Sequence, residues 1–161
     1  METMCAPWRM EYLMCEKPEG CVFCKRSLRC EDYVLFDGKT CFVMLNRYPY
    51  VNGHLMIIPI RHLGDIAGLT VGEREEIFSL VDISVKVLKE AMNPQGFNIG
   101  MNLGKAAGAG IAEHVHVHVI PRWEGDTNFM SVVGNVRVIP QDLATTAATL
   151  IPLFEKYCLE V

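Results

Sequence analysis

The sequence lacks the long apolar runs of membrane proteins and any excess of basic residues. No apolar run approaches the roughly 18 residues that a membrane-spanning helix needs, and the N-terminal region has no uninterrupted apolar segment of the signal-peptide type. The formal net charge is −4 and the pI is about 5.7, whereas a general nucleic-acid binder normally carries a basic face. We therefore expect neither a membrane nor a nucleic acid as a partner.

Internal repeats, low-complexity stretches and linker-like segments are also lacking, which predicts a single domain over residues 1–161. A hydrophobic content of 50% is enough for a sizeable core. Residues 1–20 mix apolar and charged side chains with proline and glycine, which predicts an irregular N-terminal arm. The cysteines number 7, and most of them show no pairing logic, so we expect reduced thiols and a cytoplasmic protein.

Clusters of β-forming residues between turn signals predict the strands. They cover residues 33–36, 40–45, 54–59, 97–103, 114–119 and 131–139. The first two are joined through Asp37-Gly38, which is a strong hairpin signal. Pro121 is expected to end the strand over residues 114–119.

Two segments have the patterns of helices. Thr70 and Glu73 form a capping-box pattern before a long helix, which Asn93-Pro94 is expected to end. A terminal helix is expected over residues 141–158, strained or broken at Pro152. Strands joined by hairpins and loops, with segregated helices, imply an α+β domain with a mostly antiparallel sheet.

Three of the 5 histidines alternate with valine in His114-Val115-His116-Val117-His118-Val119. This alternation predicts an extended strand whose valines face the core and whose imidazoles share the other face, about 7 Å apart. An exposed strand without function is the alternative. Neighbouring histidines that can charge near neutral pH would repel one another there, so the pattern favours a functional site.

Cys21-x-x-Cys24 has the spacing of a metal-binding pair. Two nitrogen ligands, from His62 and His114, would complete a four-coordinate structural zinc site and tie the N-terminal arm to the sheet. A pair of core thiols and a redox pair are the alternatives, although the flanking sequence lacks the strand-to-helix context of a thioredoxin-like motif.

The histidine strand follows the loop Gly104–Gly110, which is rich in glycine and alanine. Its small residues allow backbone N–H groups to approach an anion closely. The loop is not a P-loop, because no Gly-Lys-Ser/Thr follows and it leads into a strand. A plain turn is the alternative to a phosphate cradle.

Together these features favour chemistry at phosphorus. A neutral imidazole is a good nucleophile when its other nitrogen is held as a donor, and His116, flanked by its two neighbours, is the best candidate. His118 could then hold a phosphate oxygen, and Asn102 and the backbone amides around Gly110 and Ile111 could complete the charge stabilisation.

The triad followed by Ile120-Pro121-Arg122 resembles the motif of the histidine-triad (HIT) superfamily. Further segments resemble the branch that contains bacterial diadenosine-tetraphosphate phosphorylases. They are Ala6–Arg9, Asn46–Ile57, Arg61-His62 and Pro121–Phe129. The resemblance therefore extends over roughly residues 6–130.

This resemblance implies a HIT-like α+β fold with a mostly antiparallel five-stranded sheet and two main helices, usually as a homodimer whose sheets join. It implies a nucleotidyl intermediate at His116, with a main-chain carbonyl orienting the ring, and zinc on Cys21, Cys24, His62 and His114. It also places Asn46 near the ribose, and Asn102, Gly110, Ile111 and His118 at the phosphates. Many members carry Ser or Thr where this chain has Ala109-Gly110, so a hydroxyl contact to phosphate is lost.

The expected activity is cleavage of dinucleoside polyphosphates at the α-phosphate, by phosphorolysis or hydrolysis, with an AMP-like product in the second case. The alternatives are a nucleoside phosphoramidate hydrolase, a nucleotidyltransferase, or a nucleotide sensor with little turnover. Two residues near the triad have open roles. His54 is expected to support the fold rather than take part in the chemistry, and Arg122 is either a phosphate partner or a surface charge.

Overall fold

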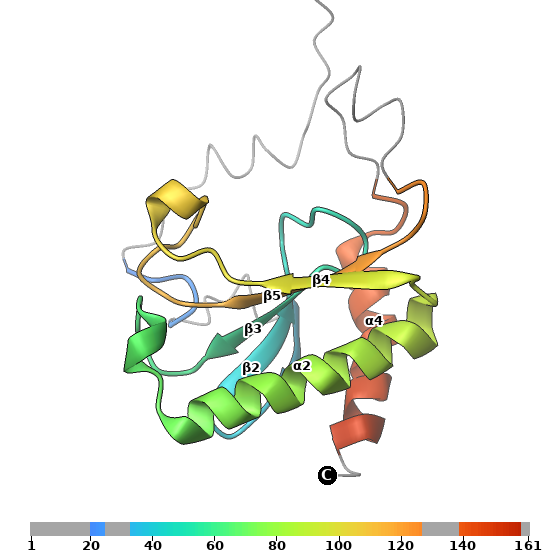
Figure 1. Ribbon diagram of the computed structural model, residues 1–161. Helices are drawn as coiled ribbons and strands as arrows, with labels where there is room; N and C mark the ends of the chain where they lie inside the picture. The colour runs from blue at the N-terminus through green and yellow to red at the C-terminus, as the bar shows by residue number, and fades with distance from the viewer. Residues whose placement is uncertain (1–19, 25–32, 127–138, 159–161) are drawn as a thin grey trace, which may run out of the picture.

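The computed structural model in Figure 1 describes residues 20–24, 33–126 and 139–158. The strands are β1 (Val34–Asp37), β2 (Cys41–Leu45), β3 (Leu55–Pro59), β4 (Gly96–Gly100) and β5 (Val117–Arg122). The helices are α2 (Val71–Met92) and α4 (Leu143–Cys158), with short 3-10 turns η2 (Ile66–Gly68) and η3 (Lys105–Ala107). The predicted α+β class, with a five-stranded sheet and two main helices, is confirmed. The predicted arm and the strand over 131–139 lie outside the described residues, apart from one terminal residue each.

All neighbouring strands are antiparallel, in the order β1-β2-β3-β5-β4. Strand β5, which carries His118, is thus an inner strand, with β3 on one side and β4 on the other. His118 pairs with Met56 of β3 and with Gly100 of β4. Both helices lie on the same side of the sheet (Figure 1).

The sheet has two different faces because side chains alternate along each strand. Residues such as Val43, Ile57 and Val117 point toward the helices and join Leu150 and Phe154 in the main core. The opposite face carries a smaller apolar cluster of Phe23, Phe42, Met44, Met56 and Ile58, which we call the outer cluster. Val115, Val117 and Val119 all belong to the main core, as the alternation predicts.

The β1–β2 hairpin forms at Asp37-Gly38 as predicted, and a helix side chain fixes it. The Glu76 carboxylate accepts hydrogen bonds from the backbone N–H of Thr40, at 2.7 Å, and from its hydroxyl. A Cβ atom on Gly38 would collide with this carboxylate and with the Cys41 carbonyl oxygen, 2.7 Å away. Glycine is therefore required at this turn by close approach.

Helix α2 begins and ends where the sequence predicts. Thr70 and Glu73 form the complete capping box, and Asn93 ends the helix in the left-handed conformation at φ 48°. The Glu73 carboxylate also binds Arg61 through two hydrogen bonds of 3.0 and 2.8 Å. These bonds lower the pKa of Glu73 to about 2, so the pair stays ionised at neutral pH. The pair anchors the residue next to His62 to the start of the helix.

The strand limits around the histidines differ from the prediction. The β5 ladder begins only at Val117, whose partner is Ile57 of β3, because the Val115 N–H bonds instead to the Leu63 carbonyl in the loop after β3. It then continues through Pro121 to Arg122. The Arg122 carbonyl accepts a hydrogen bond from Gln95 on the β4 side, so the N atom of Pro121 faces the other side, where pairing with β3 has already ended.

Two further elements differ from their predicted limits. Strand β4 ends at Gly100 rather than at residue 103. Helix α4 passes through Pro152 without a break. A proline inside a helix costs about 3 kcal/mol, but burying Leu150 and Phe154 stabilises this helix by roughly 1.5–3 kcal/mol each.

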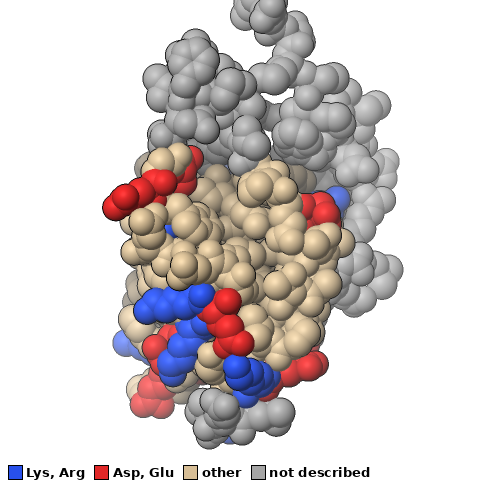
Figure 2. Space-filling view, turned by 90° about the vertical axis from the view of Figure 1, so that its right-hand side faces the viewer, with Lys and Arg blue, Asp and Glu red and all other residues tan. Residues whose placement is uncertain are grey.

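The described helices carry opposite charges side by side. Ion pairs join Lys86 to Asp82 and Lys156 to Glu90. On the face shown in Figure 2, basic side chains lie next to acidic ones, and much of the face carries neither. Among the described residues, no helix combines the length and the hydrophobicity that crossing a membrane requires.

Candidate functional site

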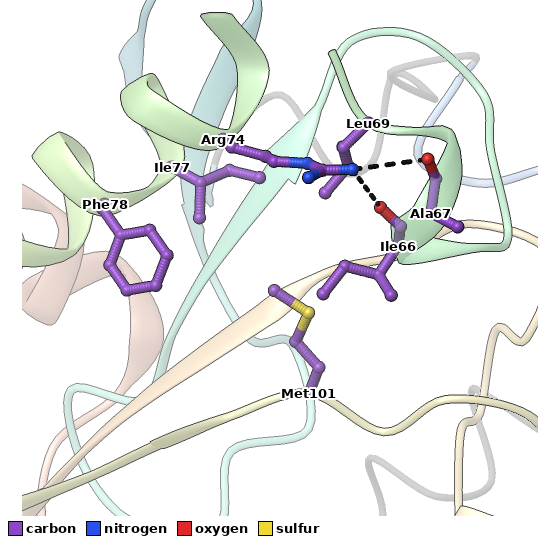
Figure 3. Close-up of a pocket in the computed structure, with 7 residues that line it drawn as sticks. All are labelled: Ile66, Ala67, Leu69, Arg74, Ile77, Phe78 and Met101. Atoms are coloured by element: carbon purple, nitrogen blue, oxygen red, sulfur yellow. Dashed lines mark hydrogen bonds between the residues drawn. The ribbon is translucent and has the colours of Figure 1, made fainter. Parts of the chain in front are cut away.

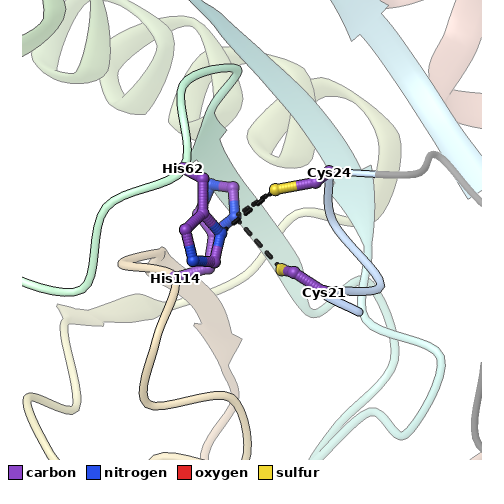
Figure 4. A group of neighbouring side chains, drawn as sticks. All are labelled: Cys21, Cys24, His62 and His114. Atoms are coloured by element: carbon purple, nitrogen blue, oxygen red, sulfur yellow. Dashed lines mark hydrogen bonds between the residues drawn. The ribbon is translucent and has the colours of Figure 1, made fainter. Parts of the chain in front are cut away.

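Four side chains with soft or borderline donor atoms meet at one end of the sheet (Figure 4). Cys21 and Cys24 come from one turn, His62 from the loop after β3, and His114 from the segment before β5. Their donor atoms all lie within 4.8 Å of one another. The structure thus brings together the four residues that the sequence proposes as metal ligands.

The spacing of these donors suits a tetrahedral zinc ion. Zn–S and Zn–N bonds of about 2.3 and 2.1 Å put sulfur and nitrogen about 3.5 Å apart around such an ion. The Cys24 Sγ lies 3.1 Å from His62 Nδ1 and 3.5 Å from His114 Nδ1, and the Cys21 Sγ lies 3.3 Å from His114 Nδ1. With four protein ligands no coordination position remains for a substrate.

His114 has the tautomer that a ligand needs. Its Nε2 lies 2.8 Å from the Pro59 carbonyl oxygen, and since a carbonyl can only accept, this nitrogen carries the proton. The Nδ1 lone pair is then directed at the two sulfur atoms. Such a hydrogen bond on the far nitrogen is typical of metal-binding histidines.

The backbone of the same residue orients His116. The His116 Nδ1–H donates to the His114 carbonyl at 2.9 Å, which leaves the lone pair on Nε2. Burial lowers the pKa of His116, although the same hydrogen bond raises it, so the ring is neutral at pH 7. A neutral imidazole with one nitrogen held as a donor is the arrangement of a nitrogen nucleophile.

A chain of hydrogen bonds sets the tautomer of His118. The Tyr50 N–H donates to His54 Nδ1 at 3.1 Å, so His54 carries its proton on Nε2. That nitrogen lies 2.9 Å from His118 Nδ1 and donates to it. Burial, and to a smaller degree His116, lower the pKa of His118 to about 4. His118 is therefore neutral at pH 7, with its proton on Nε2.

The Nε2 atom of His118 is buried and has no hydrogen-bond partner among the described residues. The rings of His118 and His116 are 4.8 Å apart and meet edge to face. An unpartnered buried donor is costly, and here it lies next to a ring with a free lone pair. The two nitrogens can act on one phosphate group, one as nucleophile and the other as donor to an oxygen.

Among the other residues expected to bind nucleotide, Asn46 contacts the hydrogen-bond chain that holds His118. The Asn46 side chain accepts a hydrogen bond from the Tyr48 N–H at 2.9 Å and lies 3.4 Å from His54 Nδ1. Ile111 packs on the outer cluster. Asn102 follows two residues after Gly100, the strand partner of His118, and Gly110 lies in the loop before the triad.

The glycine-rich loop depends on glycine at two other positions. Gly104 and Gly108 have φ values of 79° and 86°, a region that favours glycine. Gly110 has no such requirement, and a Cβ atom there would meet nothing within 4 Å. Neither backbone conformation nor close approach among the described residues therefore requires glycine at this position.

Arg122 is engaged by protein groups. The Asp126 carboxylate accepts two hydrogen bonds from its guanidinium, at 2.5 and 2.8 Å, and the Asn98 side chain accepts a third, at 2.7 Å. These contacts favour the structural interpretation over a phosphate contact. Trp123 bonds through its indole N–H to the Met92 carbonyl at 3.4 Å.

The sequence model of the HIT domain matches residues 28–125. The chain belongs to the HIT family. An AP-4-A phosphorylase of Mycobacterium tuberculosis is 44% identical over 120 residues, which cover 74% of this chain and 62% of that protein. An asymmetrical bis(5'-nucleosyl)-tetraphosphatase of Schizosaccharomyces pombe is 32% identical over 93 residues, 58% of this chain and 50% of that protein. This chain thus spans less than two thirds of either relative.

Solved structures of HIT proteins share the fold. A Zn-bound histidine triad family protein from Mycobacterium smegmatis has a TM-score of 0.70 at 24% identity, covering 88% of this chain and 97% of that one. A HIT family protein from Bacillus anthracis has a TM-score of 0.62 at 27% identity, covering 89% of this chain and 98% of that one. The predicted family and fold are therefore confirmed.

Two contributors to the HIT site have no direct signal in the triad motif. His54 donates a hydrogen bond to His118. The position of His54 before a buried strand does not reveal this role. Phe23 lies with its ring against His114 and His116, at centroid distances of 5.5 and 5.3 Å. Its place between the two cysteines is the sequence signal that could identify it.

Proposed function

We propose that this HIT protein is an enzyme that cleaves dinucleoside polyphosphates at the α-phosphate through a nucleotidyl intermediate on His116. The observation that carries the proposal is that the His116 Nε2 lone pair lies next to the buried Nε2–H of His118, which has no partner in the described part of the chain. One is a nucleophile and the other a donor for a phosphate oxygen. A structural or sensory role would not call for two neutral imidazoles held side by side in opposite tautomers.

In the first step the Nε2 of His116 bonds to the α-phosphorus, and the bond from phosphorus to the departing polyphosphate oxygen breaks. With diadenosine tetraphosphate, ATP leaves and AMP stays on the ring. A second nucleophile then attacks phosphorus and the N–P bond breaks. Inorganic phosphate gives ADP, and water gives AMP. We assign the phosphate contacts to Asn102, Gly110, Ile111 and His118, and a ribose contact to Asn46.

The substrate class is supported by the relatives, whose printed names refer to diadenosine tetraphosphate and bis-nucleosyl tetraphosphates. The outer cluster lies on the same face of the sheet as His116 and contacts it through Phe23, so its buried side chains would form the apolar floor beneath a nucleobase. Phe42 and Met44 belong to this cluster, while Val43 and Leu45 of the same strand point to the main core.

Incubation with diadenosine tetraphosphate, with and without inorganic phosphate, tests the proposal. ADP plus ATP formed only with phosphate identifies a phosphorylase, and AMP plus ATP identifies a hydrolase. Parallel reactions with an adenosine phosphoramidate test the alternative activity. Absence of product from every substrate, despite AMP binding, would contradict enzymatic function and leave the nucleotide sensor.

We also propose that Cys21, Cys24, His62 and His114 hold a structural zinc ion. The measured donor distances and the tautomer of His114 support this assignment. Zinc-bound thiolates need reduced cysteines, which fits a cytoplasmic location. The ion would fix the turn Cys21–Cys24 to the sheet, and the chemistry at phosphorus would be left to the imidazoles.

A homodimer is the third part of the proposal. Strand β4 is the last strand in the sheet order, so its outer edge can pair with another strand. Two large apolar side chains are exposed nearby in the sequence of elements: Ile99 on β4 is 47% exposed and Phe78 on α2 is 71% exposed. Figure 3 shows an apolar pocket that Phe78 lines together with η2 and Met101, the residue after β4, and where Arg74 reaches the Ile66 and Ala67 carbonyls. A second copy of this chain is the occupant that would cover such a surface.

We expect Phe78→Asp to convert the dimer to a monomer at micromolar concentration, because it places a charge in the apolar contact. Light scattering coupled to size exclusion measures the change. Thr149→Asp, which adds the same charge to the exposed side of α4, should leave the dimer intact. A dimer that survives Phe78→Asp unchanged would show that the contact lies elsewhere.

A further inference from the structure

The side chain between the two cysteines touches the proposed nucleophile. Phe23 lies in the turn Cys21–Cys24 and is 7% exposed. Its ring meets the His116 ring at a centroid distance of 5.3 Å and an angle of 62°, and the His114 ring at 5.5 Å and 89°. We call Cys21, Cys24, His62 and His114 the metal group. One buried aromatic ring therefore contacts both His114 of the metal group and the proposed nucleophile.

His116 needs such a contact to be held in place. Its hydrogen bond to the His114 carbonyl fixes one nitrogen but still allows the ring to tilt about that bond. His118 and Phe23 both meet the ring edge to face, and together they limit this tilt. Position matters here, since a displacement of about 1 Å at a reacting atom can cost about a hundredfold in rate.

Phe23 in turn depends on the metal group and on the sheet. The outer cluster supports its ring from the sheet side. Its flanking residues place their Sγ atoms 3.1–3.5 Å from the ring nitrogens of His62 and His114. A metal ion would lock this turn, and with it the ring, against the histidines.

We propose that Phe23 is a positioning residue, which couples occupancy of the metal group to the orientation of His116. This inference rests on the proposed role of His116 as nucleophile. The metal group then acts on catalysis through packing, without contact between ion and substrate. Its removal would release Phe23 and let the His116 ring leave the orientation needed for attack.

Phe23→Leu, which keeps an apolar side chain but removes the ring, tests the proposal in zinc-loaded protein. Val22→Ala, in the same turn and next to the same cluster, is the matched control. With diadenosine tetraphosphate in a single turnover, nucleotidylation should slow by about ten- to a hundredfold in Phe23→Leu, while the Kd of AMP changes by less than about threefold. Val22→Ala should keep the wild-type rate, and both variants should keep their zinc.

NMR of the imidazole nitrogens gives a second readout that does not depend on turnover. Wild-type His116 should show one Nδ1–H tautomer, whereas Phe23→Leu, or wild type treated with chelator, should show a broadened or mixed signal. An unchanged NMR signal and an unchanged nucleotidylation rate in Phe23→Leu would overturn the coupling. Loss of zinc from Phe23→Leu would also overturn it, and so would a change in the Kd of AMP without a change in the nucleotidylation rate. A single tautomer in a wild-type protein that never becomes nucleotidylated would instead refute the proposed function and leave the coupling standing.

Discussion

Replacing His116 with alanine is expected to reduce turnover of diadenosine tetraphosphate by at least about a thousandfold. The substitution removes Nε2, the nitrogen that keeps its lone pair because the Nδ1–H of the ring donates to the His114 carbonyl. The remaining donors can still polarise the phosphate, but the covalent route has no other nucleophile in this position. His118 cannot replace it, because its Nε2 carries the proton. The measurement is the initial rate of ATP formation.

The His116→Ala variant should remain folded, because the missing ring lies on the face of the sheet opposite the main core. Unchanged zinc content, circular dichroism and AMP affinity would establish this. A rapid base quench of wild type with labelled substrate should trap label on the protein that is stable in base and released by later acid treatment, and His116→Ala should trap none. Turnover within about tenfold of wild type would remove the covalent mechanism.

The placement of the histidines could be predicted from sequence because side-chain alternation depends only on an extended backbone. Val115 joins the main core although it precedes the β5 ladder. The start of that ladder could not be predicted, because it depends on the tertiary hydrogen bond from the Val115 N–H to the Leu63 carbonyl. Likewise, Pro121 is tolerated in β5 because pairing with β3 stops at Val119, which no local pattern reveals.

The metal group, too, could be predicted from the sequence only in part. The spacing of Cys21 and Cys24 places two sulfur atoms on one turn, so local sequence suffices for that pair. The approach of His62 depends on the loop after β3, which the Arg61–Glu73 pair attaches to α2. The role of His54 required the direction of two hydrogen bonds, from Tyr50 and toward His118. Sequence reasoning identifies the donor types, while tertiary contacts decide their tautomers.

Substitution of Cys21 by serine is expected to lower zinc content and thermal stability together. The Cys21 Sγ lies 3.3 Å from His114 Nδ1, and a serine hydroxyl does not replace a thiolate as a zinc ligand. Structural zinc can contribute on the order of 10 kcal/mol to folding. The turn Cys21–Cys24 should therefore detach and lower the melting temperature. Elemental analysis and calorimetry on the same sample measure both effects.

Cys158→Ser is the matched control, because this half-buried thiol lies on α4, outside the metal group. It should keep a full zinc content and a melting temperature that falls when a chelator is added. In Cys21→Ser the chelator should have little further effect, because the ion that it would remove is already absent. Zinc content equal to wild type in Cys21→Ser would show that the ligands are other residues. The chelator could instead lower the melting temperature of Cys21→Ser by as much as it lowers that of wild type. This result would show that Cys21 does not bind the metal, because two changes that remove the same interaction do not add.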